Sequence, residues 1–126
     1  MKSGSTSIAD FMPDGDVFIV KFKNDADLDG DGIKELLSAL ENAAEGKKYK
    51  ALADTRRLLL GHVSRSAYHV NVKEENAPHR LAEAFVVTDL PIRLLINFYH
   101  KTVKPTTPSK AFKTMEEAME WLNTFK

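Results

Sequence analysis

The chain has 126 residues, 43% of them hydrophobic and 29% charged, a composition that suits one globular domain and is too balanced for a disordered chain. Lys and Arg together number 18, as do Asp and Glu, so the formal net charge is zero and no overall field attracts the protein to nucleic acid. The absence of cysteine excludes disulfides, thiolate catalysis and cysteine-based zinc sites.

The first seven residues are small and polar, so we expect residues 1–7 to form a disordered tail and residues 8–126 to form a single domain. The tail lacks the apolar centre of a signal peptide, and no apolar run approaches the roughly 20 residues that span a bilayer. These features predict a cytoplasmic protein that is not transmembrane.

Turn chemistry near the N-terminus predicts a β-hairpin. Ile8–Met12 and Val17–Lys23 are separated by Pro13–Asp16, which contains proline, glycine and aspartate, the residues that turns prefer. Apolar and lysine side chains alternate at the end of the second run, as in a strand with one buried face.

Helices and strands then alternate along the chain. The expected elements are a helix over Ile33–Ala44, a strand over Tyr49–Asp54, a helix over Ser64–Glu75, a strand over Ala84–Val87, a helix over Pro91–Lys104, a strand over Lys110–Lys113 and a last helix after the capping box at Thr114. This alternation predicts an α/β fold with a mostly parallel sheet, an N-terminal antiparallel hairpin strand and four helices.

The least polar block is Ala82–Pro105, which joins the strand over Ala84–Val87 to the helix over Pro91–Lys104. The helix is apolar at positions expected to face the sheet, namely Ile92, Leu95, Ile96, Tyr99 and Val103. Leu94 and Phe98 lie off this stripe, so they are candidates for a partner interface or for a groove that binds a hydrophobic ligand. Burial between the sheet and a neighbouring helix is the alternative.

The element order and the closing pattern TDLPIRLLINFYHKTVKPTTPSKAFKTMEEAMEWL resemble the SpoIIAA-like proteins of the STAS/SEC14-like fold. The resemblance covers roughly residues 8 to 125, and its sharpest features are Asp89–Leu95, Asn97–Tyr99, Lys104-Pro105 and Glu116–Leu122. It implies a SpoIIAA-like, STAS-type fold more firmly than any activity.

The better understood relatives imply regulation of a partner protein, switched by phosphorylation of a serine at a helix N-terminus. The matching region makes Asp54, Ser64 and Ser66 the candidate switch residues, although the Asp-Ser-Ser-Gly motif of the family is missing. Ser64 is also explained as a simple helix N-cap, the position that serine strongly prefers.

An acidic segment, Asp25–Gly32, has the alternating aspartates of a calcium loop, which makes Asp27, Asp29 and Asp31 the metal candidates. The best register places Ser38 where an EF-hand has its bidentate glutamate, and a strand instead of a helix precedes the loop. The other interpretation is that Asp29 and Asp31 lie at the positive end of the following helix.

No motif dictates a reaction. The four histidines lack zinc-type spacing, no Gly-x-Ser-x-Gly elbow supports a catalytic set such as Ser64, His62 and Asp54, and no glycine-rich nucleotide loop is present. We therefore expect a non-enzymatic protein without catalytic residues or cofactors.

The sequence is best interpreted as a regulatory or protein–protein interaction module of STAS type, with a homodimer through the 91–104 helix as one form of association. The alternative is a carrier of a small hydrophobic or lipid-like ligand, which the SEC14-like side of the resemblance implies. A solid core with an exposed apolar patch on the helix favours a protein partner, whereas an apolar cavity beneath the helix favours a ligand.

Overall fold

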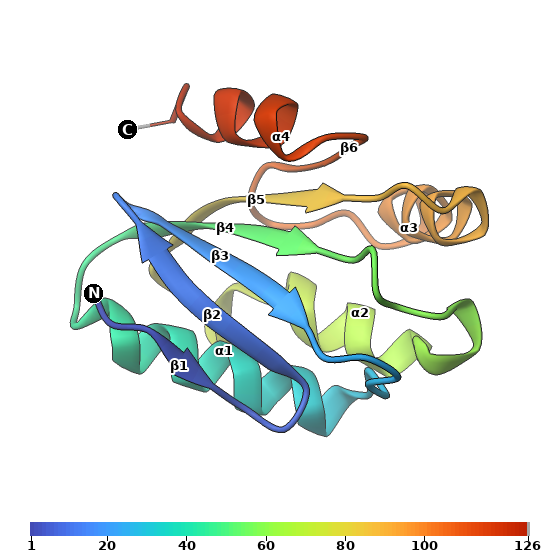
Figure 1. Ribbon diagram of the computed structural model, residues 1–126, viewed down its shortest axis with the longest axis horizontal. Helices are drawn as coiled ribbons and strands as arrows, with labels where there is room; N and C mark the ends of the chain where they lie inside the picture. The colour runs from blue at the N-terminus through green and yellow to red at the C-terminus, as the bar shows by residue number, and fades with distance from the viewer. Residues whose placement is uncertain (126) are drawn as a thin grey trace.

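The computed structural model describes residues 1–125 and has an α/β fold, with one six-stranded mixed sheet and four α-helices in that part of the chain (Figure 1). The strands are β1 (Gly4–Ser5), β2 (Ala9–Asp14), β3 (Val17–Phe22), β4 (Tyr49–Asp54), β5 (Arg80–Val86) and β6 (Ser109–Phe112). The helices are α1 (Gly30–Ala44), α2 (Arg65–Val72), α3 (Leu90–Thr102) and α4 (Met115–Leu122), with short 3-10 turns η1 (Leu60–His62) and η2 (Glu74–Asn76). The predicted α/β class is confirmed.

The strands lie in the sheet in the same order as in the chain. The pairs β1–β2 and β2–β3 are antiparallel, and β3, β4, β5 and β6 are parallel. The expected hairpin is β2–β3, and Gly15 in its turn has a φ of +62°, a backbone conformation that glycine adopts without steric cost.

The N-terminal residues differ from the disordered tail that we expected over residues 1–7. Gly4 and Ser5 pair with Phe11 and Asp10 of β2, and the amide of Lys2 donates a hydrogen bond of 3.2 Å to the carbonyl of Ala43. Gly and Ser have low strand propensity, so no local pattern predicts this strand. It forms because the edge of β2 offers unpaired backbone groups.

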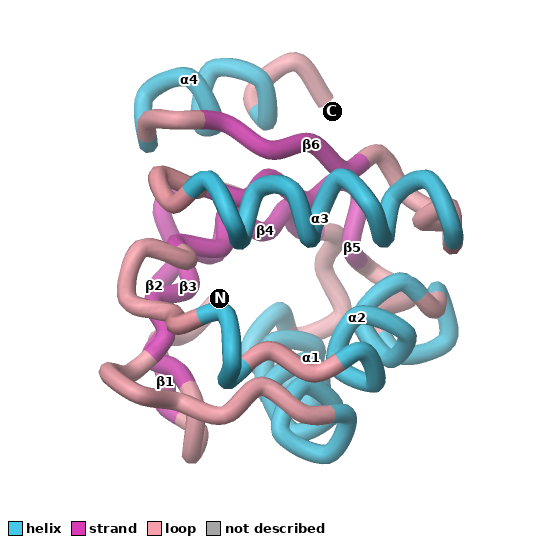
Figure 2. Tube along the Cα trace, turned by 90° about the vertical axis from the view of Figure 1, so that its right-hand side faces the viewer, coloured by secondary structure: helices cyan, strands magenta, loops and turns pink. Residues whose placement is uncertain are grey.

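Helices cover both faces of the sheet. Figure 1 shows α1 and α2 on one face and α4 on the other, and Figure 2 shows α3 running past the ends of the strands on the side of α1 and α2. Side chains alternate accordingly: Phe18 and Val20 of β3 join the core under α1, whereas Val17 joins the core under α4. Every residue of β4 is buried, because helices cover this central strand on both sides.

Helix α1 begins three residues earlier than its apolar pattern predicted. Asp29 is its N-cap, and the carboxylate accepts a hydrogen bond of 2.7 Å from the amide of Gly32. A Cβ at Gly30 would lie 3.3 Å from Val70 of α2, so the glycine allows the two helices to approach closely. The pattern failed here because glycine has low helix propensity, which tertiary packing overrides.

None of the helices within residues 1–125 has the length and apolar character that a bilayer span requires.

Candidate functional site

An apolar cavity of about 90 Å³ lies between the sheet and the three helices α1, α2 and α3. Ala51 and Ala53 of β4 line it on the sheet side, and Ile92, Leu95 and Ile96 line it from α3. Four of the five residues predicted to face the sheet from this helix, all but Val103, thus line a space instead of a solid core.

The space exists because small side chains of the central strand face a loosely packed helix. Ala51 and Ala53 leave room above β4, and Ile92 is the one residue of α3 that is fully buried. An engineered cavity of about 150 Å³ with a similar apolar lining stays free of water and binds benzene. The smaller space here suits a small flexible molecule, or one end of a longer molecule.

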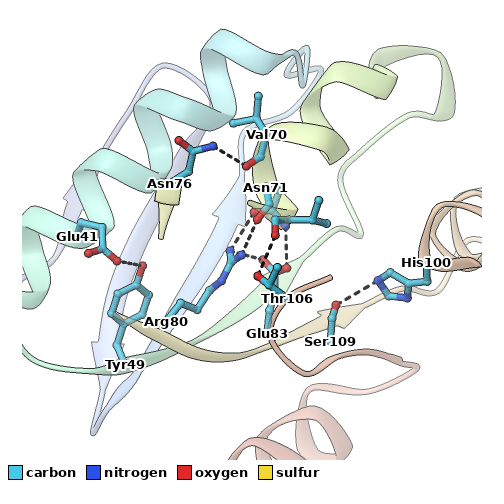
Figure 3. Close-up of polar contacts among 11 residues, drawn as sticks. Glu41, Tyr49, Val70, Asn71, Asn76, Arg80, Glu83, His100, Thr106 and Ser109 are labelled. Atoms are coloured by element: carbon cyan, nitrogen blue, oxygen red, sulfur yellow. Dashed lines mark hydrogen bonds and ion pairs between the residues drawn. The ribbon is translucent and has the colours of Figure 1, made fainter. Parts of the chain in front are cut away.

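A polar cluster of the partly buried Asn71 and the buried Arg80 and Glu83 lies in the lining of the cavity. Figure 3 shows the contacts among the three side chains. Arg80 donates from Nη1 to Asn71 Oδ1 at 3.0 Å and to Glu83 Oε2 at 3.2 Å, and from Nη2 to the backbone carbonyl of Asn71. The amide group of Asn71 donates to Glu83 Oε1 at 2.7 Å. The three side chains thus form a closed network that links β5 to α2.

An irregularity in β5 brings Arg80 and Glu83 together. Tyr49 pairs with Arg80, but the next residue, Lys50, pairs with Ala82, so Leu81 is an extra residue in β5. Side chains three residues apart in a regular strand point to opposite faces, and the inserted residue returns Arg80 to the face of Glu83.

The pair is almost completely buried, with exposed fractions of 4% for the Arg80 side chain and 9% for that of Glu83. The Arg80 Nε is buried and has no hydrogen-bond partner within residues 1–125. A buried donor without a partner costs about 1 to 3 kcal/mol. The Nε–H of Arg80 is therefore a donor for which residues 1–125 supply no acceptor.

Aromatic side chains connect α3 to α2 at one side of the cavity. The centroid of the Tyr68 ring lies 4.9 Å from that of Tyr99 and 5.9 Å from that of His100. The Tyr68 hydroxyl donates a hydrogen bond of 2.9 Å to the carbonyl of Val103. Burial raises the pKa of Tyr68 to about 12, so its hydroxyl stays protonated at neutral pH. Burial also lowers the pKa of His100, whose Nε2 lies 3.1 Å from Ser109 Oγ (Figure 3).

The outer face of α3 carries large apolar side chains that nothing in residues 1–125 covers. Leu90, Leu94 and Phe98, spaced four residues apart, are 63%, 58% and 51% exposed. Leu94 and Phe98 are the two residues that the sequence singled out, and they lie on the solvent side of the helix, not between it and a neighbour. The structure thus has an apolar cavity beneath α3, which favours a ligand, and an exposed apolar patch on α3, which favours a protein partner.

Of the three candidate switch residues, Ser64 and Ser66 are in contact with each other. Ser64 is the N-cap of α2 and accepts from the amide of Ala67 at 3.3 Å, while Ser66 Oγ accepts from the amide of Gly30 at 3.1 Å. The two serine hydroxyl oxygens are 2.9 Å apart. The cap interpretation of Ser64 is confirmed.

Asp54 takes a different partner. Both of its carboxylate oxygens accept from the side chain of Arg56, at 2.8 and 2.7 Å, and this hydrogen bonding holds the pKa of Asp54 below its ordinary value. Asp54 is paired with Arg56 and the Ser64 hydroxyl caps α2, so within residues 1–125 no hydrogen bond joins Asp54, His62 and Ser64 into a catalytic set.

The three metal candidates do not converge. Asp29 caps α1, Asp31 is exposed in the first turn of that helix, and Asp27 Oδ1 lies 3.0 Å from His62 Nδ1 without hydrogen-bond geometry. Within residues 1–125 no group of three or more His, Asp or Glu side chains is placed to hold a metal ion. The interpretation of Asp29 as a residue at the positive end of a helix is the one that the structure supports.

Sequence reasoning missed Asn71, Arg80 and Glu83, the polar part of the site. Two opposite charges three residues apart, directly before an apolar strand, were the available signal. Simple alternation assigns them to opposite faces, and the extra residue that overrides this is visible only in the pairing with β4.

A family model described as "Domain of unknown function (DUF7793)" matches residues 11–126. No curated protein and no solved structure matches the chain.

Proposed function

The chain belongs to the DUF7793 family, and we propose that it is a cytoplasmic, non-catalytic binding module of SpoIIAA-like, STAS-type fold that holds a small apolar ligand beneath α3. The observation that carries the proposal is the cavity of about 90 Å³ between α3 and the alanines of β4. The STAS-type part is supported by the order of the elements, a hairpin followed by alternating strands and helices.

An unfilled apolar space of this size has an energetic cost. Protein interiors contain few voids larger than a water molecule, and cavity volume costs about 24 cal/mol per Å³ in core mutants. A molecule that filled the space would therefore recover on the order of 2 kcal/mol of packing, besides burying its own apolar surface.

The pairing of the ionisable groups supports binding instead of catalysis. Glu83, the carboxylate in the lining, already accepts hydrogen bonds from Asn71 and Arg80. The Tyr68 hydroxyl donates to a backbone carbonyl. A general base must reach a substrate proton, and Glu83 and Tyr68 are both engaged in hydrogen bonds within the protein.

A titration with pentane tests the proposal. We expect pentane to shift the methyl NMR signals of Ala51, Ala53 and Ile92, which line the cavity. The variant Ala53→Val fills part of the space, so it should weaken pentane binding at least severalfold without loss of folding. Leu94→Ser, on the exposed side of the same helix, is the matched control and should bind pentane as the wild type does.

Unshifted methyl signals at saturating pentane would contradict ligand binding in this cavity. Equal pentane affinity in the wild type and in Ala53→Val would show that pentane binds outside this cavity.

The exposed side of α3 supports a second function, binding of a protein partner. Leu90, Leu94 and Phe98 form an apolar stripe, and residues 90–113 contain five Lys or Arg residues but no Asp or Glu. A complementary partner is an amphipathic helix with an apolar stripe flanked by carboxylates. A homodimer through the same helix would bring two basic segments together, so an acidic partner fits the charge better.

A synthetic amphipathic helix with a leucine stripe and flanking glutamates tests this second function, and the same peptide with lysines is its control. Binding of the acidic peptide should weaken at high salt and in Leu94→Ser/Phe98→Ser, while the basic peptide should not bind. Sedimentation of the protein alone shows whether it dimerises. Equal binding of both peptides, or a dimer lost in the double variant, would rule out the acidic partner.

A further inference from the structure

We infer that the ligand of the cavity beneath α3 is an uncharged molecule with one hydrogen-bond acceptor, which receives the Arg80 Nε–H while its apolar part fills the space. The inference rests on the proposed ligand-binding function and adds the chemical class of the ligand. It follows from the donors, the charge balance and the volume of the lining.

An unpaired donor of Arg80 sets the polar part of the ligand. A guanidinium has five N–H groups, and the structure assigns partners to Nη1 and Nη2 of Arg80 but none to Nε. The side chain is 4% exposed, so bulk water does not satisfy this donor. Arg80 lines the cavity, and a ligand that carries an acceptor supplies the missing partner.

The charged side chains of the lining balance each other. Arg80 and Glu83 lie 3.2 Å apart and neutralise each other, and among residues 1–125 they are the charged side chains of the lining. A carboxylate ligand would add a buried negative charge that no free cation in the lining compensates, which is costly. A neutral carbonyl, ether or alcohol oxygen accepts the Nε–H without that cost.

The rest of the lining is mostly apolar, and the space that it encloses is small. A space of about 90 Å³ accommodates few heavy atoms, and Ala51, Ala53, Ile92 and Ile96 surround it with apolar surface. The Tyr68 hydroxyl is already used as a donor to the carbonyl of Val103. One acceptor on an otherwise apolar small molecule, or at one end of a longer neutral molecule, therefore matches the site.

Three probes of similar size separate the alternatives: pentane, 2-pentanone and butanoate. Because a hydrogen bond to a charged donor is among the stronger ones, we expect 2-pentanone to bind roughly tenfold more tightly than pentane, and butanoate to bind more weakly than both. The Arg80 Nε–H NMR signal should shift with 2-pentanone and stay unchanged with pentane.

The double variant Arg80→Met/Glu83→Met provides the matched control, because replacing a buried ion pair by apolar residues of similar volume often preserves stability. It should bind pentane and lose the preference for 2-pentanone. Should the double variant fail to fold, the Nε–H signal of the wild type provides the same test.

Equal affinities for pentane and 2-pentanone would overturn this inference and leave the proposed function standing. Tightest binding of butanoate would assign an anionic ligand and overturn it too. Binding of none of the three would reject the proposed function itself.

Discussion

At the scale of single residues, Arg80 and Glu83 are the most consequential pair in the molecule. Both are buried, and each provides the other with its counter-charge. A buried ion pair adds little net stability compared with apolar residues, because two charges must be removed from water. Its presence in an apolar lining therefore favours a role in recognition.

Removal of Arg80 alone should be strongly destabilising. Arg80→Met leaves the Glu83 carboxylate buried without its cation, which costs about 3 to 5 kcal/mol in comparable cases. The double variant Arg80→Met/Glu83→Met should recover most of that loss. Urea denaturation of both variants measures the difference, and a double variant no more stable than Arg80→Met would contradict the pairing.

His100 gives the protein a predicted pH dependence. Its pKa is lowered in the folded state, chiefly by burial, with the charge of Glu83 opposing the shift. The unfolded chain, with a histidine pKa of about 6.5, therefore takes up the proton first as the pH falls. The His100 contribution to stability is fully present above about pH 6.5 and is lost as the pH falls through the lowered pKa.

The free energy of unfolding should thus fall more steeply with decreasing pH in the wild type than in His100→Asn, across the window just below pH 6.5. Asparagine keeps a polar group near Ser109, which makes it a suitable replacement. Urea titrations at a series of pH values provide the measurement. Identical slopes for the two proteins would show that His100 is not responsible.

At the scale of elements, α3 differs from the other helices in how it is held. Six residues of α1 are buried, but in α3 only Ile92 is. Its other contacts are partly buried side chains around the cavity and the aromatic group of Tyr68, Tyr99 and His100. A helix with so little buried surface opens locally at lower free energy than the core.

Hydrogen exchange should show this difference directly. We expect backbone amides in α3 to exchange at least roughly tenfold faster than those in the middle of α1, since local opening exposes less apolar surface. Addition of 2-pentanone should slow exchange in α3 and leave α1 unchanged. Equal protection of the two helices in the free protein would show that α3 is held as firmly as α1.

At the scale of the whole molecule, two apolar cores share one sheet. The larger lies under α1, α2 and α3, and the smaller lies under α4, where Ala118 and Leu122 cover Leu52 and Val86. Trp121 and Phe112 pack against this second core, and their ring centroids lie 5.6 Å apart. The parallel strands are stable only because both of their faces are covered.

Removal of residues 114–126 should therefore abolish folding. Without α4 the face that carries Val17, Leu52, Ala84 and Val86 is exposed to water, an apolar patch that favours aggregation. We expect loss of the cooperative thermal transition. Deletion of residues 1–5, which removes only β1, is the control and should shift the transition by much less. A cooperative transition without α4 would contradict the two-core description.

Local chemistry explains why so much of the fold could be predicted. Caps, turns and side-chain periodicity act within a few residues, so Ser64, Pro91 and Thr114 mark helix starts that the structure contains. The same rules identified Leu94 and Phe98 as positions off the inward stripe of α3. The strand β1 was missed because its pairing partner, not its own sequence, creates it.

What the sequence by itself determined is the order of the elements and which face of each is apolar, because both depend on neighbours along the chain. Only the tertiary structure decided where packing is incomplete and where charges meet. Ala51 and Ala53 leave a cavity because α3 lies above them, and Arg80 meets Glu83 because one extra residue in β5 reverses its face. These outcomes depend on contacts between distant segments, so no local pattern encodes them.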